Sequence, residues 1–369
     1  MKTVFPRLYR AARPAAFLAA TSTGCFAHLT GDGAHDATDR RVAREFRPVQ
    51  VSLYLPPLLA QLRTSPAAEL PPAAAAFGRF APAVSVRADA DFLYIESNGL
   101  PAHNMMVGIT AWQQQVPLPQ PYRGSNAWRI PLRPVPAPDG GVTIRDRFLR
   151  GAIALAANGI PIFNPQNNRG AVSQEIGELD QWGGHCGRAD DYHYHVAPLH
   201  LQAVLGKALP VAYALDGYPI HGLAEADDSA PKGLDHWNGH DHAPLGYHYH
   251  ATLKYPYLNG GFRGVVTERE EQVDPQPRAQ GVREALQVLR GAKITGFKTI
   301  TPEKSYALQY DVLGGAGAID YEQVSEGVWK FRFTSPDGAV REETYRAGDR
   351  RGGGGGKKGK DGKGRRDEE

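Results

Sequence analysis

The stretch Tyr192-His193-Tyr194-His195 returns later in the chain as Tyr247-His248-Tyr249-His250, and this repeated tetrapeptide decides how the fold is interpreted. Each copy ends the same longer pattern, Asp-x-Trp-x-Gly-His-x6-Tyr-His-Tyr-His, which begins at Asp180 and again at Asp235. Matching positions are 55 residues apart throughout (235 − 180). A repeat of this length indicates that one structural unit is used twice.

The similarity extends upstream of the tetrapeptides. Residues 158–163 (Asn-Gly-Ile-Pro-Ile-Phe) are related to residues 216–221 (Asp-Gly-Tyr-Pro-Ile-His), so the loop that follows is three residues shorter in the second copy. A third, partial copy at residues 98–103 places His103 where the others have Phe163 and His221. We therefore predict a pseudo-symmetric domain built from a duplicated unit.

Each tetrapeptide is expected to lie on a short strand that follows a tight turn, because Tyr favours strands and Gly, Pro and Asp surround both copies. Residues two apart on a strand share a face, so His193 and His195 project together with Cβ atoms about 6–7 Å apart. Two neutral imidazoles can then reach one metal ion, and His185 or His240 from the preceding loop supplies a third ligand. The tyrosines face the other way and supply packing.

The N-terminus has the pattern of an export signal over residues 1–24. Basic residues from Lys2 to Arg13 precede a short apolar stretch at residues 15–20 and a small-residue junction at Thr23-Gly24-Cys25. Gly24-Cys25 resembles a bacterial lipoprotein box, although Ser22 stands where Leu is usual, so a membrane tether through a lipid on Cys25 is one alternative. The expected location is extracytoplasmic: periplasmic, secreted or lipid-anchored at the cell surface.

A transition-metal site formed by imidazoles of both copies is the central prediction, either as one shared site or as two related sites. The candidate ligands are His185, His193, His195, His240, His248, His250, His221 and His103. Imidazole donors suit zinc, copper, iron or nickel and disfavour calcium and magnesium. Copper and zinc are the leading candidates for an exported protein.

Several of these residues have a structural alternative. Histidines that only hydrogen-bond carbonyls and carboxylates would be repeated as faithfully as ligands. Asp180 and Asp235 could orient an imidazole or cap a turn. Cys186 could add a thiolate, but its aligned position is Asp241, outside the repeated framework. Trp182 and Trp237 are expected to be core anchors.

These motifs resemble the YHYH domain proteins of bacteria and some eukaryotes. The resemblance rests on the paired tetrapeptides, the Gly-His before each of them, the Asn/Asp-Gly-x-Pro turns and Tyr255-Pro256-Tyr257, and it covers residues 91–264. It implies an extracytoplasmic protein, and the family has no firmly assigned activity. The chain departs from the family pattern at Trp182 and Trp237, where Cys is frequent, so a disulfide between those positions cannot form.

The composition limits the fold class and the kinds of partner that the chain can have. With 369 residues, of which 41% are hydrophobic, the chain can bury a sizeable core, and a net charge of +3 without a basic stripe argues against nucleic-acid binding. Many Gly and Pro residues and scarce helical periodicity predict a mainly β fold, a β-sandwich or barrel-like domain. Before it, we expect a tether and Ala/Pro-rich segment at 25–83.

The predicted organisation places the YHYH domain at 84–264 and a small α+β or β appendage at 282–347. Within the first, a hairpin is expected at 84–95 and buried strands at 152–157 and 211–215. Within the second, an amphipathic helix is expected at 282–290, and strands at 294–300, 305–312, 328–334 and 339–345. The Gly/Lys-rich tail at 348–369 is predicted to be disordered.

The function that these patterns favour is an exported protein that binds copper or zinc through duplicated His clusters. One alternative is a metal-dependent enzyme, a hydrolase or copper oxidoreductase, with Glu175, Glu178 or Asp191 as acid or base. Another is a surface interaction module with structural histidines. A serine nucleophile elbow, a phosphate-binding loop and a His-Glu-x-x-His helix are all missing from the sequence.

Overall fold

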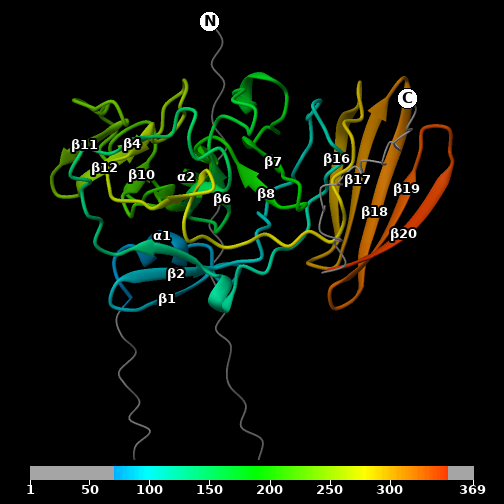
Figure 1. Ribbon diagram of the computed structural model, residues 1–369, viewed down its shortest axis with the longest axis horizontal. Coiled ribbons are helices and arrows are strands. Elements are labelled where there is room, and N and C mark those ends of the chain that lie inside the picture. Colours follow the sequence, from blue (N-terminus) through cyan, green and yellow to red (C-terminus); the bar gives the residue numbers. More distant parts are fainter. Residues whose placement is uncertain (1–69, 348–369) are drawn as a thin grey trace, which may run out of the picture. The chain divides into compact units, whose positions relative to one another are not determined.

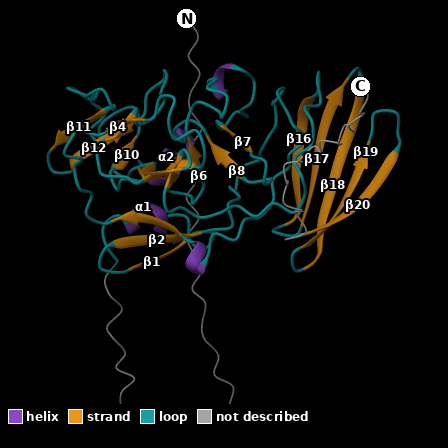
Figure 2. Cartoon of the chain, in the orientation of Figure 1, coloured by secondary structure: helices purple, strands orange, loops and turns teal. Residues whose placement is uncertain are grey.

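The computed structural model describes residues 70–347, and this part of the chain is mainly β (Figures 1 and 2). The predictions for the export signal, Cys25 and the basic tail lie outside the described residues. The helical elements are short: α1 Ala74–Gly78, α2 Gln202–Leu205, and 3-10 turns at Gly124–Asn126, Ser173–Glu175 and Leu199–Leu201. Within residues 70–347, no helix has the length and apolar character needed to cross a membrane.

The tetrapeptides belong to one sheet of eight strands, in the order β11-β12-β10-β9-β5-β6-β8-β7. Its strands are β5 Ala152–Ala156, β6 Pro161–Phe163, β7 Gly184–Cys186, β8 Tyr192–Tyr194, β9 Ala212–Ala214, β10 Pro219–His221, β11 Gly239–His242 and β12 Gly246–His250. All five residues of β5 and all three of β9 are buried, which explains the unbroken apolar runs seen in the sequence. The strands expected in these two places are confirmed.

The eight strands form two halves with the same arrangement, and we name them half A (β5 to β8) and half B (β9 to β12). The halves meet where β5 pairs antiparallel with β9. In half A, β6 runs parallel to β8, which pairs antiparallel with β7. In half B, β10 runs parallel to β12, which pairs antiparallel with β11. The duplication itself remains our interpretation of the sequence.

Glycine is required in the turn that follows each central strand. Gly159 and Gly217 follow β5 and β9 with φ angles of 75° and 99°, a region that side chains with a Cβ rarely adopt. A Cβ added at Gly159 would also lie 2.8 Å from the Cβ of Ser97, too close for any side chain. These turns return the chain to the sheet and so position β6 and β10.

Three sheets of two or three strands accompany the central one among the described residues, in addition to the C-terminal sheet. The predicted hairpin at 84–95 is confirmed as β1 and β2, and β3 extends it to three antiparallel strands. The bounds are β1 Ser85–Ala88, β2 Phe92–Glu96 and β3 Trp128–Pro131, with the pairs β4 Val142–Thr143 and β13 Gly261–Phe262, and β14 Glu268–Arg269 and β15 Gln272–Val273.

The C-terminal region is an antiparallel sheet of five strands in sequence order. They are β16 Lys293–Thr301, β17 Ser305–Val312, β18 Gly315–Ser325, β19 Val328–Thr334 and β20 Val340–Arg346. Four of them correspond to the predicted strands, and the fifth, β18, was not predicted.

The helix predicted at residues 282–290 is wrong, because this segment is irregular in the structure. Arg283 is buried in an ion pair with Asp190, and the N–H of Leu289 donates to the carbonyl of Trp112 at 3.1 Å. These long-range contacts replace the local hydrogen bonds that a helix would make, so the apolar periodicity there reflects contacts with the preceding domain.

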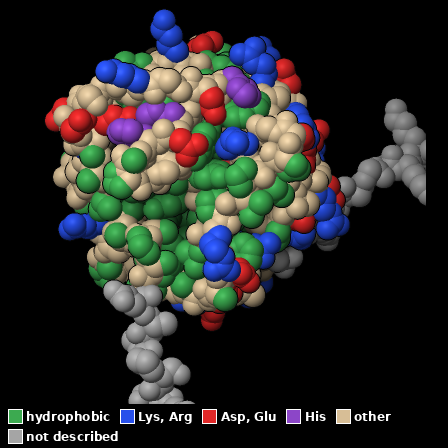
Figure 3. Space-filling view, turned by 90° about the vertical axis from the view of Figure 1, so that its left-hand side faces the viewer, with side chains coloured by type: hydrophobic (Ala, Val, Ile, Leu, Met, Phe, Trp, Pro, Cys, Tyr) green, Lys and Arg blue, Asp and Glu red, His purple; other side chains and the backbone are tan. Residues whose placement is uncertain are grey.

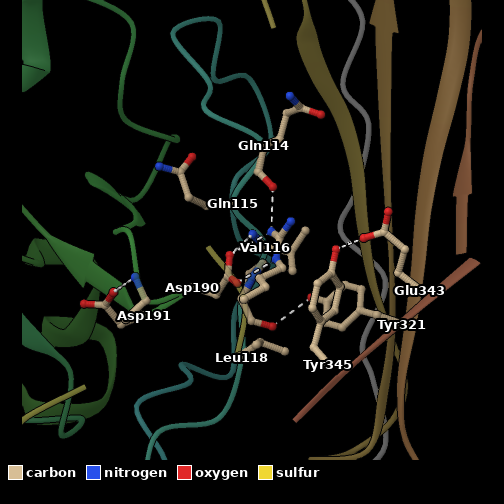
Figure 4. Close-up of polar contacts among 12 residues, drawn as sticks. Gln114, Gln115, Val116, Leu118, Asp190, Asp191, Tyr321, Glu343 and Tyr345 are labelled. Carbon is tan, nitrogen blue, oxygen red and sulfur yellow. Dashed lines mark hydrogen bonds and ion pairs between the residues drawn. The ribbon is translucent and has the colours of Figure 1, made fainter. Parts of the chain in front are cut away.

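Buried polar contacts join the loop at Val116 and Pro117 both to the C-terminal sheet and to half A (Figure 4). The Tyr321 hydroxyl donates to the carbonyl of Pro117 at 2.8 Å. Asp190 accepts hydrogen bonds from the N–H of Val116 at 2.9 Å and from Arg283 Nε at 2.8 Å. Asp190 lies two residues before β8, so these contacts fix the segment that leads into the first tetrapeptide.

Candidate metal centres

Strand register brings three imidazoles together in each half of the sheet. On β8 and β12 histidines alternate with tyrosines, so the two histidines of each tetrapeptide share one face. His185 on β7 is directly opposite His193, and His240 on β11 is directly opposite His248. Opposite residues in an antiparallel pair point to the same side of the sheet, so a third imidazole joins each pair.

In half A these residues form cluster A, composed of His185, His193 and His195. Their candidate ligand atoms all lie within 4.8 Å of one another. The Nε2 atoms of His185 and His195 are 3.0 Å apart, and His193 and His195 are each only 3% exposed.

In half B the corresponding group, cluster B, has a fourth member and consists of Glu225, His240, His248 and His250. The Nε2 atom of His248 lies 3.2 Å from that of His240 and 3.1 Å from that of His250. Glu225 Oε1 lies 3.2 Å from His240 Nε2 and 3.4 Å from His250 Nε2. The structure therefore has two separate groups that could hold a metal, rather than one shared group.

Backbone carbonyls fix which nitrogen of each ring faces the centre of cluster B. The Nδ1 atoms of His240, His248 and His250 lie 2.7, 2.9 and 2.9 Å from the carbonyl oxygens of Lys232, Gly246 and Gly222. A carbonyl oxygen can only accept a hydrogen bond, so each Nδ1 carries the hydrogen and each neutral ring presents the Nε2 lone pair. Three lone pairs thus converge, and a cation between them would relieve their repulsion.

Cluster A uses the same anchoring for two of its rings. His193 Nδ1 is 3.0 Å from the carbonyl of Asp191, and His195 Nδ1 is 2.5 Å from that of Asn164. Their Nε2 atoms are thereby available to an ion. Carbonyl partners of this kind are the usual means by which a protein orients a metal-bound imidazole.

The spacing of the nitrogens fits an ion of the size of zinc. Bonds of about 2.0–2.1 Å in a tetrahedral arrangement separate the ligand nitrogens by about 3.3 Å. The Nε2–Nε2 distances in the two clusters are 3.0, 3.2 and 3.1 Å. Little rearrangement would be needed to seat such an ion among the imidazoles of cluster B or between His185 and His195 of cluster A.

Burial lowers the pKa of four of the six cluster imidazoles. Burial and the neighbouring His193 lower the pKa of His195 to about 3, and burial, with the neighbouring rings, holds the pKa of His185 well below its usual value. Burial likewise lowers the pKa of His248 and His250. At neutral pH these four rings, His185, His195, His248 and His250, are therefore in the unprotonated form that a metal ion requires.

The repeated aspartates cap turns, which was one of the two roles expected of them. Asp180 Oδ1 accepts from the N–H groups of Trp182 and Gly184 at 2.9 and 3.2 Å, and Oδ2 accepts from the Tyr192 hydroxyl at 2.8 Å. Asp235 makes the same three bonds in half B, at 2.8, 3.0 and 2.8 Å. Each aspartate thus joins the turn before one strand to a tyrosine of the next and fixes the hairpin that carries the histidines.

His221, a candidate ligand, packs beside cluster B without belonging to it. Its ring centroid lies 5.1 Å from that of His248, and burial lowers its pKa to about 4. The matching residue in half A is Phe163, which stacks on His193 at 3.8 Å. At this matched position each half therefore has a ring that packs against a histidine of its cluster.

His103, the other outlying candidate, lies on the tyrosine side of β8. Its Nε2 is 2.8 Å from the Tyr194 hydroxyl, its Nδ1 is 2.8 Å from the Asn104 carbonyl, and its ring stacks on Trp182. The strand separates it from cluster A, because Tyr194 and His195 point to opposite faces.

Glu225 is the residue of this site that sequence reasoning missed. It is 7% exposed and lies in the loop between β10 and β11. Its position falls outside the repeated pattern, and the residue 58 positions earlier is Asn167. The available signal was a carboxylate four residues after His221.

The other acidic and sulfur candidates lie elsewhere. Glu175 is exposed, and Glu178 is buried and accepts hydrogen bonds from Asn167, Ser173 and Arg169. Asp191 Oδ2 lies 3.6 Å from His193 Nδ1, on the anchored side of that ring. Cys186 is a buried free thiol whose pKa burial raises well above its usual value, and it belongs to neither cluster.

Comparison with known proteins agrees with the motif pattern. Residues 127–232 match the model of the YHYH protein family. This YHYH match confirms the family resemblance seen in the sequence. It contains all of cluster A, while the three histidines of cluster B follow it. Neither a curated protein nor a solved structure matched the chain.

Proposed function

We propose that this chain is an exported protein that binds two transition-metal ions, one in cluster A and one in cluster B. The observation that carries the proposal is the convergence of three Nε2 lone pairs in cluster B, each fixed by a carbonyl behind the ring. Purely structural histidines would use both ring nitrogens for hydrogen bonds within the protein. Here one nitrogen is anchored and the other is directed at its neighbours.

Copper and zinc are the metals that these donors suit. Imidazole is a ligand for both, and the single carboxylate in cluster B does not create the oxygen-rich site that calcium or magnesium needs. The export-type N-terminus supports a location outside the cytoplasm, with Cys25 as a point of lipid attachment. Histidine side chains also reach the surface beside acidic ones on the side of the molecule where β11 and β12 lie (Figures 1 and 3).

Metal analysis of the full chain tests this proposal. We expect two equivalents of zinc or copper by mass spectrometry after purification without chelators. His195→Ala should remove one equivalent, and the double substitution His248→Ala/His250→Ala should remove the other. His236→Ala changes an exposed histidine outside both clusters and should keep both equivalents. Folded protein that stays metal-free even when supplied with zinc and copper would leave only the structural interpretation of the histidines.

A further inference from the structure

One matched position beside the two clusters holds Asn167 in half A and Glu225 in half B. Both residues open the same kind of turn: the N–H of each donates to the carbonyl four residues later, at 2.8 Å for Asn167 and 2.9 Å for Glu225. The carbonyl of each accepts from the N–H three residues later, at 2.9 and 3.1 Å. The backbone is therefore alike, and only the side chain differs.

The Asn167 side chain is committed to its own loop. Its Oδ1 accepts from the N–H of Arg169 at 2.9 Å, and its Nδ2 donates to Glu178 Oε2 at 3.0 Å. Among residues 70–347, the group around His185, His193 and His195 contains no carboxylate, whereas Glu225 completes cluster B. Cluster A thus offers three protein ligands where cluster B offers four.

A cavity of about 250 Å³ opens onto cluster A. Besides the three imidazoles, its lining includes Gln115, Phe163, Gln166, Asn167, Arg169 and Glu178. Three imidazoles supply no negative charge to offset that of a divalent ion, and the Arg169 guanidinium at the cavity wall is paired with the Glu178 carboxylate. Arg169 is held there by Glu178 Oε1, 2.6 Å from its Nη2.

We propose that metal-loaded cluster A keeps an open coordination position that binds a small anion entering through this cavity, and that cluster B is closed. This inference rests on the metal binding proposed above. A vacant fourth position is what distinguishes catalytic zinc sites from structural ones, in which the protein supplies all four ligands. The ligand class is a small carboxylate or inorganic anion, because the site is cationic and the cavity is small. Arg169 is the group that makes the second contact to it.

Cobalt substitution of the full chain provides the test, with azide as the probe anion. Protein with both His248→Ala and His250→Ala keeps only Glu225 and one imidazole in cluster B and so retains cluster A alone, whereas His195→Ala protein retains cluster B alone. After each has bound one equivalent of Co²⁺, azide should change the visible absorption of the cluster A protein in a saturable way and leave the cluster B protein unchanged. A normal cobalt content with no azide response at cluster A overturns the open position, whereas failure to bind cobalt overturns the metal proposal instead.

Two milder substitutions keep the test decisive if a histidine variant does not fold. Glu225→Gln removes the carboxylate charge from cluster B and should give the otherwise intact protein a second azide-responsive cobalt ion. Arg169→Gln should weaken azide binding at cluster A roughly tenfold, since it removes a charge-assisted contact. Unchanged azide titrations in both variants, with full cobalt occupancy, would contradict the proposal.

Discussion

Half A and half B of the central sheet share strand order, pairing directions, capping aspartates and the two-histidine strand, yet they end in sites of different character. In half B the loop residue Glu225 lies among the imidazoles. In half A the side chain of its counterpart Asn167 bonds Glu178 in its own loop, and a cavity adjoins the imidazoles of cluster A. The strands therefore fix where an ion would bind, whereas a single loop side chain decides whether that ion keeps a coordination position open to a ligand from solution.

Metal removal should have the largest effect and should separate the halves most clearly. Cluster B supplies four protein ligands, so we expect it to bind zinc at least about tenfold more tightly than cluster A, a difference of about 1.4 kcal/mol in stabilisation at equal free zinc. Thermal unfolding of the two single-cluster proteins, with and without a chelator, measures this. An equal shift in both proteins would contradict the distinction between closed and open clusters.

The Glu225→Gln substitution should lower the zinc affinity of cluster B about ten- to a hundredfold and leave cluster A unchanged. The turn should survive because its hydrogen bonds are made by the backbone. Competition with a chromophoric chelator gives both affinities. Asp227→Asn, in the same exposed loop, is the matched control, and a similar loss in that variant would point to a loop effect instead of a lost ligand.

Acid should destabilise the metal-free protein. The pKa of His195 is lowered to about 3 and that of His221 to about 4, from about 6.5 in the unfolded chain, so the unfolded state takes up these protons first as pH falls. The stability that these groups contribute is complete above pH 6.5 and is lost towards pH 4, at about 1.4 kcal/mol per pH unit for each proton. Urea unfolding at several pH values measures the slope.

A substitution that makes the two halves alike measures how much half B contributes to this pH dependence of stability. His221→Phe copies Phe163 of half A into half B and removes one of the titrating groups. We expect a shallower decrease in stability between pH 6.5 and 4 than in the parent chain. A slope that does not change would show that His221 titrates normally in the folded protein.

Removal of single tyrosine hydroxyls should have the smallest effect on metal binding, although it should lower stability. Tyr192→Phe and Tyr247→Phe each delete a 2.8 Å hydrogen bond to a capping aspartate. We expect a loss of about 1–3 kcal/mol in the free energy of unfolding for Tyr192→Phe, and less for Tyr247→Phe because that hydroxyl is less deeply buried. Metal content should stay at its original value in both, and loss of metal in either would assign the tyrosine a direct role at the ion.

The sequence alone predicted which histidines lie together, because side chains alternate between the two faces of a strand. His-x-His at positions 193–195 and 248–250 required both rings to share a face, and the Gly-His at 184–185 and 239–240 fell on the adjacent strand. Whether the rings formed one site or two depended on where the strands lie in the sheet. That order places the tetrapeptides on opposite sides of the central β5–β9 pair, which sequence spacing does not encode.

The features that sequence did not reveal depend on contacts between distant segments. Glu225 acts with the histidines only because the loop after β10 returns over β11 and β12. Strand β18 contains two glycines and two alanines, which have low strand propensity, and it is held by pairing with a neighbour on each side. The segment at 282–290 is irregular instead of helical, and its Arg283 forms a buried ion pair with the distant Asp190.

That contact has a consequence for any attempt to shorten the protein. Asp190 and Arg283 are each 3% exposed at the side chain, and the Asp190 carboxylate lies only two residues before the strand that holds His193. Trimming the chain after the second tetrapeptide would remove Arg283 and both of its hydrogen bonds to Asp190. The segment before β8 would then lose a support of the strand that carries His193, so the metal content of a truncated protein would not represent that of the native half A.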